Sequence, residues 1–216
     1  MADADKLVLY NDALLLCGER FIASLTEERE PRRLLDQVWA SGAVDRCLEE
    51  GQWHFAMRTV ELDYDTSLEP AFGYNRAFAK PDDWVLTSAV CSDEFFRSPL
   101  TRYTDEERYW YSDLDTIYVR YVSNDADYGN DLARWPKSFH DFVAAHMASR
   151  IVNKLTNSEE ERARVIDQRK KALSIAKNRA AMAEPTSFAS QGSWGRARNR
   201  FPNRRDGGNT SGNLIP

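Results

Sequence analysis

Three pairs of closely spaced carboxylates are the first candidates for catalytic or metal-binding residues in this 216-residue chain. Two neighbouring carboxylates can divide acid and base roles between them or hold a divalent cation. The pairs are Asp82/Asp83, Asp93/Glu94 and Asp113/Asp115. Asp is also a preferred turn residue, because its side chain bonds the local backbone. We expect these residues to be solvated turn carboxylates; a small hydrolase working through Asp82 and Asp83 is the enzyme alternative.

The histidines give no catalytic or metal-binding pattern. His140 and His146 share one predicted helix at a spacing of six, so they lie on opposed faces and cannot chelate one metal. We expect His146 to be a hydrogen-bonded core or interface histidine. Nucleophile, Walker and dinucleotide motifs are absent from the sequence. The sequence therefore predicts no enzyme, no cofactor and no metal site.

The cysteines and the first residues of the chain indicate in which compartment the protein is expected. Cys17, Cys47 and Cys91 are widely spaced, which argues against zinc or a disulfide framework. We expect reduced core thiols in an intracellular product. The first residues carry Asp3 and Asp5 in place of a basic and apolar leader, and no apolar run approaches membrane-span length. These features predict a soluble protein.

Residues 184–216, which we call the C-terminal arm, differ from the rest of the chain. The formal net charge of −5 divides into +3 for the arm and −8 for the remainder. The arm is rich in Ser, Gly, Asn, Arg and Pro, a composition that cannot bury a core of its own. Its isolated apolar and arginine side chains are typical of a segment that docks on a partner. The candidate partner-binding residues are Phe188, Trp194, Arg196, Arg198, Arg200, Phe201, Arg204, Arg205, Leu214 and Ile215.

The chemistry of the arm leaves three roles open. Arginines interleaved with Trp194 could bind nucleic acid through phosphate contacts and base stacking. The same residues could dock on an acidic protein surface, or the segment could be a plain tail. An acidic body argues against tight wrapping of nucleic acid.

A predicted helical hairpin at residues 136–183 is the central element of the expected fold. Apolar residues from Phe139 to Leu155 recur every three or four positions, and a similar stripe runs from Ile166 to Ala183. Pro136 suits a helix start, and Ser158 with Glu161 has the spacing of a capping box. The link at residues 156–158 is short enough to require antiparallel helices.

Two further helices, at residues 7–17 and 31–50, are expected to cover the hairpin. Between them and the hairpin, short alternating stretches predict strands at 59–64, 74–79, 84–91, 102–104, 108–111 and 116–122. The predicted fold class is α+β: a four-helix bundle with a long C-terminal antiparallel helical hairpin, a small antiparallel β-domain inserted between helices 2 and 3, and an extended arm. The predicted domains are residues 1–56 with 134–183 (helical bundle), 57–133 (β-domain) and 184–216 (basic arm).

Five segments, in this order, resemble the tail tubular protein A family of short-tailed phages (podoviruses), the head-to-tail adaptors. They are NDALLLCGERFIASL (11–25), CLEEGQWHFAMR (47–58), KPDDW (80–84), DTIYVRYV (115–122) and WPKSF (135–139) with the Ala-rich helix that follows. Gly18 and Trp53 fit the pattern, whereas Cys17 replaces a more usual aliphatic residue. The resemblance covers residues 7–183, and the C-terminal arm has no counterpart in it.

The resemblance implies a virion structural protein and no catalysis. Members of this family form rings of twelve copies between the portal protein and the tail nozzle, which is tail tubular protein B-like. DNA passes through the channel without specific binding, tail fibres attach near the joint, and no membrane is involved. This chain would then be made in the host cytoplasm and reside in the virion at the head-tail joint. The alternative is a nucleic-acid-binding accessory protein that acts through the arginines of the arm.

Overall fold

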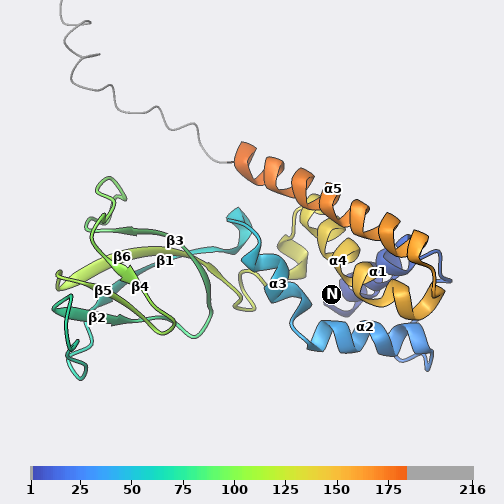
Figure 1. Cartoon of the computed structure of the whole chain (residues 1–216), viewed down its shortest axis with the longest axis horizontal. Coiled ribbons are helices and arrows are strands. Elements are labelled where there is room, and N and C mark those ends of the chain that lie inside the picture. The colour runs from blue at the N-terminus through green and yellow to red at the C-terminus, as the bar shows by residue number, and fades with distance from the viewer. Residues whose placement is uncertain (1, 184–216) are drawn as a thin grey trace, which may run out of the picture. The chain divides into compact units, whose positions relative to one another are not determined.

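The computed structural model describes residues 2–183 of the chain. Figure 1 shows the helices gathered on one side of the strands. In the described residues no helix has the length and apolar character needed to cross a bilayer. The helices are α1 (Ala2–Leu16), α2 (Glu30–Ala40), α3 (Ala43–Glu49), α4 (Lys137–Thr156) and α5 (Glu159–Ala183), with short 3-10 turns at His54–Ala56 and Leu132–Arg134.

Helix α4 lies at the centre of the helical part. All residues from Phe142 to Ala148 are buried, because α1, α2, α3 and α5 each pack against this helix. The predicted stripe, which includes Phe139, Met147 and Ile151, is buried as expected. The small side chains beside this stripe are buried as well. Helix α4 is therefore buried on more than one face, whereas the sequence predicted an amphipathic helix with a single buried face.

Helix α5 forms an antiparallel hairpin with α4, as the sequence predicts. The turn is made by Asn157, which has a left-handed conformation with φ of 48° and donates its N–H to Asn153. The Ser158 hydroxyl accepts the N–H of Glu161 at 3.4 Å. The Glu161 carboxylate pairs with Arg164 and does not cap the helix, so only half of the predicted capping box forms.

The helix predicted at residues 31–50 is broken in two. Gly42, between α2 and α3, has φ of 80°, a left-handed conformation that side-chain-bearing residues adopt only at a cost. The N–H groups of Ser41 and Gly42 end α2 by bonding back to Gln37 and Trp39. The chain therefore changes direction at this glycine.

The strands form two antiparallel three-stranded sheets. The first has the order β1-β6-β3 and the second the order β2-β5-β4. In the first sheet Val60 lies opposite Val119, and the β3 side of the register is irregular near Trp84 and Thr87. The strands are β1 (Met57–Asp63), β2 (Arg76–Ala79), β3 (Trp84–Cys91), β4 (Thr104–Asp105), β5 (Tyr109–Ser112) and β6 (Thr116–Ser123).

The expected four-helix bundle with an inserted β-domain is wrong, although the α+β class is consistent. The described residues form five helices and two small sheets. Strand β6 explains why the sheets are not a separate insert. Its residues Ile117, Val119 and Tyr121 face a small core within the β region, which we define as residues 57–133. Its next residue, Val122, lies in the helical core, where Met57 also packs.

Two expectations about buried side chains are confirmed. Cys17, Cys47 and Cys91 are free and buried. Burial raises the pKa of the Cys17 thiol to about 11, so thiolate is scarce at neutral pH. His146 is 8% exposed and hydrogen-bonded, as predicted for a core histidine.

Candidate functional site

The ten residues that the sequence predicts to bind a partner lie outside the described residues. They are Phe188, Trp194, Arg196, Arg198, Arg200, Phe201, Arg204, Arg205, Leu214 and Ile215. Their role therefore stays a prediction. The carboxylate pairs and the histidines lie within the described residues.

One of these carboxylate pairs binds its own turn, and another binds residues that are distant in the sequence. Asp93 accepts the N–H of Arg97 at 3.0 Å, which lowers the pKa of its carboxyl group. Asp113 accepts the backbone N–H of Asn75 at 3.2 Å, and Asp115 pairs with a neighbouring arginine at 3.1 Å. Asp93 therefore stabilises its own loop, as the turn interpretation predicts, whereas Asp113 and Asp115 connect to residues 38 and 39 positions away at the start of β2.

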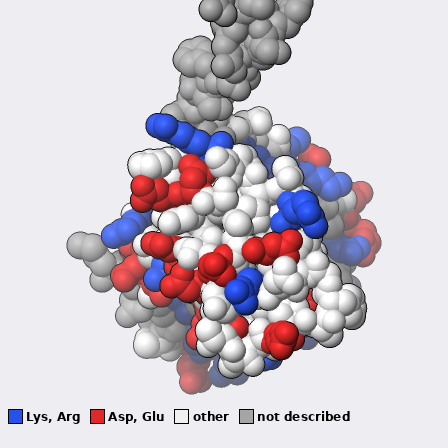
Figure 2. All heavy atoms as spheres, turned by 90° about the vertical axis from the view of Figure 1, so that its left-hand side faces the viewer, with Lys and Arg blue, Asp and Glu red and all other residues white. Residues whose placement is uncertain are grey.

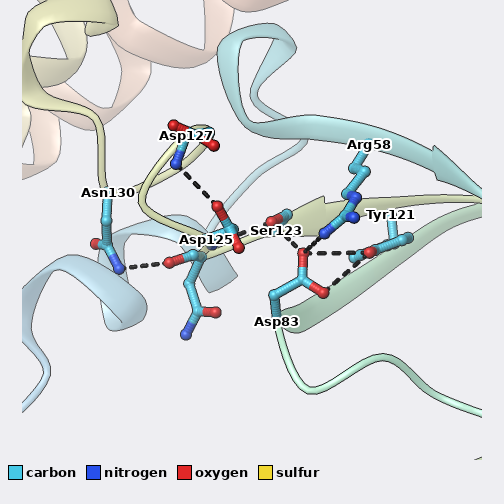
Figure 3. A network of polar contacts seen from close by, with 8 residues as sticks. Arg58, Asp83, Tyr121, Ser123, Asp125, Asp127 and Asn130 are labelled. Atoms are coloured by element: carbon cyan, nitrogen blue, oxygen red, sulfur yellow. Dashed lines mark hydrogen bonds and ion pairs between the residues drawn. The ribbon is translucent and has the colours of Figure 1, made fainter.

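Asp83 departs from the expectation of a solvated carboxylate, because only 14% of its side chain is exposed. Its carboxylate accepts hydrogen bonds from Arg58 at 2.8 Å, the Tyr121 hydroxyl at 3.1 Å and the Ser123 hydroxyl at 2.5 Å (Figure 3). Burial raises the pKa of this carboxyl group, but the hydrogen bonds outweigh burial and leave the pKa below its ordinary value. Asp83 is therefore an ionised anchor that joins β1, β6 and the turn before β3, while its neighbour Asp82 is exposed.

The polar network continues from Ser123 into the loop that leads to α4. The N–H of Gly129 donates to the Ser123 carbonyl at 3.1 Å, and the Trp135 indole donates to the Gly129 carbonyl at 2.8 Å. A Cβ on Gly129 would lie 2.3 Å from the Ser123 carbonyl oxygen, so only glycine fits there. Asn124 adds a bond of 3.1 Å to Asp45 of α3. These contacts fix the sheet to the helices.

A second polar cluster joins the two sheets. Lys80 has only 4% of its side chain exposed and pairs with Asp105 at 2.5 Å. Its ammonium group lies 3.5 Å from the centre of the Trp84 ring and 5.3 Å from that of Trp110, within cation–π range. The Thr87 hydroxyl accepts both indole N–H groups and donates to Asp105. The buried lysine is held by one carboxylate and two aromatic rings, so the cluster connects the two sheets.

A third cluster lies where α3, α4 and α5 meet. Arg169 of α5 donates to Nδ1 of His146 at 3.1 Å and forms an ion pair with Glu50. Burial, followed by the charges of Arg169, Arg150 and Arg46, lowers the pKa of His146 to about 4. His146 is therefore neutral at physiological pH and accepts the arginine hydrogen bond through Nδ1.

Three residues with metal-ligand chemistry meet at the start of α4, a grouping that the sequence analysis missed. The ligand atoms of Asp12, His140 and Asp141 all lie within 4.8 Å of one another. Lys137 bridges the two carboxylates, at 3.5 Å from Asp12 and 3.2 Å from Asp141. Its ammonium group already supplies the positive charge that a cation would bring. Lys137 and Asp141 are four apart, a helix-pair spacing that could have drawn attention to them.

Acidic side chains distinguish the β region from the helices. Residues 57–133 carry 16 acidic and seven basic side chains, a formal net charge of −9. The helical residues 1–56 and 134–183 carry 17 basic and 16 acidic side chains, a net charge of +1. Figure 2 looks onto the end of the β region and shows Asp and Glu spread across it. This surface repels polyanions at distances within the Debye length, about 8 Å in physiological salt.

Comparison with known proteins adds no relative from which a function could be transferred. No protein-family model matches the chain, and no curated protein matches it either.

Proposed function

We propose that this protein is a structural head-to-tail adaptor of a bacteriophage virion, similar to tail tubular protein A of short-tailed phages. In this proposal it forms a ring, of twelve copies as in that family, between the portal protein and the tail nozzle. The ring surrounds the DNA channel, and tail fibres attach close by. The protein acts by fitting between its neighbours and transforms no substrate.

The observation that carries the proposal is the order of the five family-like segments along residues 7–183. In the structure these segments contribute residues on which packing depends. Leu14 and Trp53 lie in the helical core, Asp83 anchors the sheet, and Tyr121 and Phe139 are buried. A resemblance concentrated at such positions supports a shared scaffold, because these residues constrain how the elements pack.

The environment of the polar residues also supports an architectural role. Asp83 and Lys80 are each contacted by several side chains from other elements, and His146 of α4 accepts a hydrogen bond from Arg169 of α5. Groups held in this way stabilise contacts between elements.

The charge of the β region suits a protein past which DNA moves. A surface with a net charge of −9 repels the phosphate backbone, so DNA would slide along it without adhering. The basic residues of the C-terminal arm would then serve protein contacts. We propose that the arm inserts into a groove on the portal protein or on a neighbouring subunit.

The experiment that tests this function is assembly with portal-bearing heads. The full chain should bind such heads, and native mass spectrometry of the detached complex should give a closed ring. A variant that lacks residues 184–216 should fold, with unchanged circular dichroism, but fail to attach. Equal attachment of the two chains would contradict the role of the arm. Density for this chain elsewhere in the particle than between portal and nozzle would contradict the adaptor function.

The alternative function is that of a nucleic-acid-binding accessory protein. Unlike the adaptor, such a protein would bind DNA with an affinity that depends on salt. The full chain would shift labelled duplex DNA with an affinity that falls steeply as salt rises. Replacing the arginines at 196, 198 and 200 with Ala would abolish the shift. The adaptor proposal predicts no shift at physiological salt in either case.

A further inference from the structure

Three side chains that can bind a metal ion meet between α1 and the start of α4. Asp12 belongs to α1, whereas His140 and Asp141 are consecutive residues of α4. The Nδ1 atom of His140 lies 3.5 Å from Oδ2 of Asp12 and 3.9 Å from Oδ1 of Asp141. One imidazole nitrogen therefore faces a carboxylate oxygen from each of the two helices.

This nitrogen of His140 is buried and has no hydrogen-bond partner among the described residues. Burial, followed by the charge of Lys137, lowers the pKa of His140, so the imidazole is neutral at physiological pH. A neutral imidazole carries a lone pair with which it can bind a metal ion. Buried polar atoms normally have a partner, and a cation suits a nitrogen that lies beside two carboxylates.

The ammonium group of Lys137 is paired with the same two carboxylate oxygens. It lies 3.5 Å from Oδ2 of Asp12 and 3.2 Å from Oδ1 of Asp141. These oxygens therefore already hold one cation, and Lys137 is the group that a metal ion must displace. Its side chain is 73% exposed, and ion pairs of exposed side chains contribute little to stability, so displacement into solvent costs little.

The spacing of the three ligands suits a small transition-metal ion. Zinc binds nitrogen and oxygen at about 2.0–2.2 Å, which separates neighbouring ligands of a tetrahedral site by roughly 3.3–3.6 Å. The three ligand atoms lie within 4.8 Å of one another, and Asp141 is exposed enough to rotate toward the other two. A mixed nitrogen and oxygen set favours zinc over calcium or magnesium, which prefer oxygen ligands.

A hollow of about 400 Å³ beside these residues leaves room for a further ligand. It is lined by Asp12, Lys137 and Asp141, and by Gln168 of α5. The side-chain oxygen of Gln168 is buried and has no hydrogen-bond partner within residues 2–183. A water molecule on the ion would find space in this hollow and an acceptor for its hydrogen bond.

We propose that Asp12, His140 and Asp141 form a binding site for zinc or a similar divalent transition-metal ion. Each residue supplies one ligand, and water completes the coordination. Lys137 neutralises the carboxylates when the metal is absent. Because the ligands come from α1 and α4, the bound ion ties the first helix of the chain to the central helix. The inference goes beyond the adaptor function, since the site needs neither a partner protein nor DNA.

Titration of the metal-free full chain with zinc, followed by calorimetry, tests the site. We expect one zinc ion per chain. His140→Gln and Asp141→Asn should each weaken binding at least about tenfold, because even the loss of a group behind a metal ligand costs that much. His54→Gln removes an exposed histidine outside the cluster, so it is the matched control and should bind zinc as the wild type does. Circular dichroism should show that all three variants fold.

Removal of the competing lysine should have the opposite effect. Lys137→Met removes a positive charge about 4 Å from the bound ion, which should raise the zinc affinity at least about fivefold. Lys154→Met is the matched control, because Lys154 is an exposed lysine of the same helix, about 25 Å further along its axis. That variant should bind zinc with unchanged affinity.

Four results would overturn the proposal. The first is a wild-type chain that binds no zinc at millimolar concentration. The second is binding that His140→Gln leaves unchanged or that His54→Gln weakens equally. The third is an affinity that Lys137→Met does not raise, and the fourth is displacement of zinc by an equal concentration of magnesium. The measurement uses the isolated chain, so it can fail while attachment to portal-bearing heads succeeds, and the reverse also holds.

Discussion

Around α4, the helical part packs Trp53 against Phe139 and Phe142 with ring centres 4.8 and 6.2 Å apart. The β region, by contrast, encloses Lys80 and Asp83 among aromatic rings and hydroxyl groups. These aromatic contacts depend on removing apolar surface from water and carry no charge, although the buried His146 of α4 makes the helical part sensitive to acid. The arrangement in the β region depends on charged groups that must stay ionised to keep their partners.

The net charges show the same difference. The β region carries −9 and the helical residues of the compact unit carry +1. An excess of like charge destabilises a compact fold through self-repulsion. The β region therefore depends on specific ion pairs and hydrogen bonds, whereas the helices depend on apolar packing. One compact unit thus combines an apolar core with a polar scaffold, and the two should be destabilised under different conditions.

The largest expected effect is the loss of an aromatic side chain from the helical core. Phe142→Ala removes a fully buried ring that contacts Trp53 and Phe139 and leaves a cavity. We expect the free energy of unfolding to fall by about 3–5 kcal/mol, measured by urea denaturation. Phe72→Ala, at a position of the β region that is 91% exposed, should change it by less than about 0.5 kcal/mol. Similar losses for the two variants would contradict the comparison.

The next effect is a pH dependence of the helical part through His146. Its folded-state pKa of about 4 lies below the ordinary value of 6.5, so the unfolded chain binds the proton more tightly. Stability should therefore fall as the pH drops from 6.5 to 4, by about 3 kcal/mol in all. His146→Gln keeps an acceptor for Arg169 and should give a flatter profile in this range. A wild-type profile as flat as that of the variant would show that the buried imidazole does not resist protonation.

The smallest of the three effects concerns Asp83 and appears at lower pH. Asp83→Asn removes a charge that accepts from Arg58 and Ser123, and should cost about 2 kcal/mol at pH 7. Because the folded-state pKa of Asp83 is lowered, its contribution is present above the ordinary Asp pKa of about 3.9 and is lost as the pH falls through the folded value. The difference between wild type and variant should therefore vanish in acid. Asp82→Asn, at the exposed neighbour, is the matched control and should change stability by less than about 0.5 kcal/mol at any pH.

Much of the fold could be predicted because it depends on local patterns. The α4–α5 hairpin and its turn at Asn157 follow from apolar spacing and the short link. Strand β3 has the predicted bounds, and β6 extends one residue further than predicted, because alternating β-branched residues specify strands locally. The break at Gly42 was missed, since one glycine costs a helix only about 1 kcal/mol and packing decides whether the helix continues.

The candidate site was less predictable, because its contacts join distant parts of the chain. Asp83 meets Arg58 across 25 residues and Ser123 across 40, and Arg169 meets Glu50 across 119. Arg169 falls on the apolar stripe predicted for α5, and only the tertiary structure shows that it is half-buried as the partner of His146. Spacing along the sequence carries no signal for such pairs.

By itself, then, the sequence determined the α4–α5 hairpin, most strands and the free cysteines. These features arise from periodicity and composition, which act over a few residues. The tertiary structure alone decided that the strands divide into two sheets, that Val122 of β6 joins the helical core, and that Asp12 meets His140 and Asp141. Those outcomes depend on which surfaces meet, and many surfaces of similar pattern could have met in the unfolded chain.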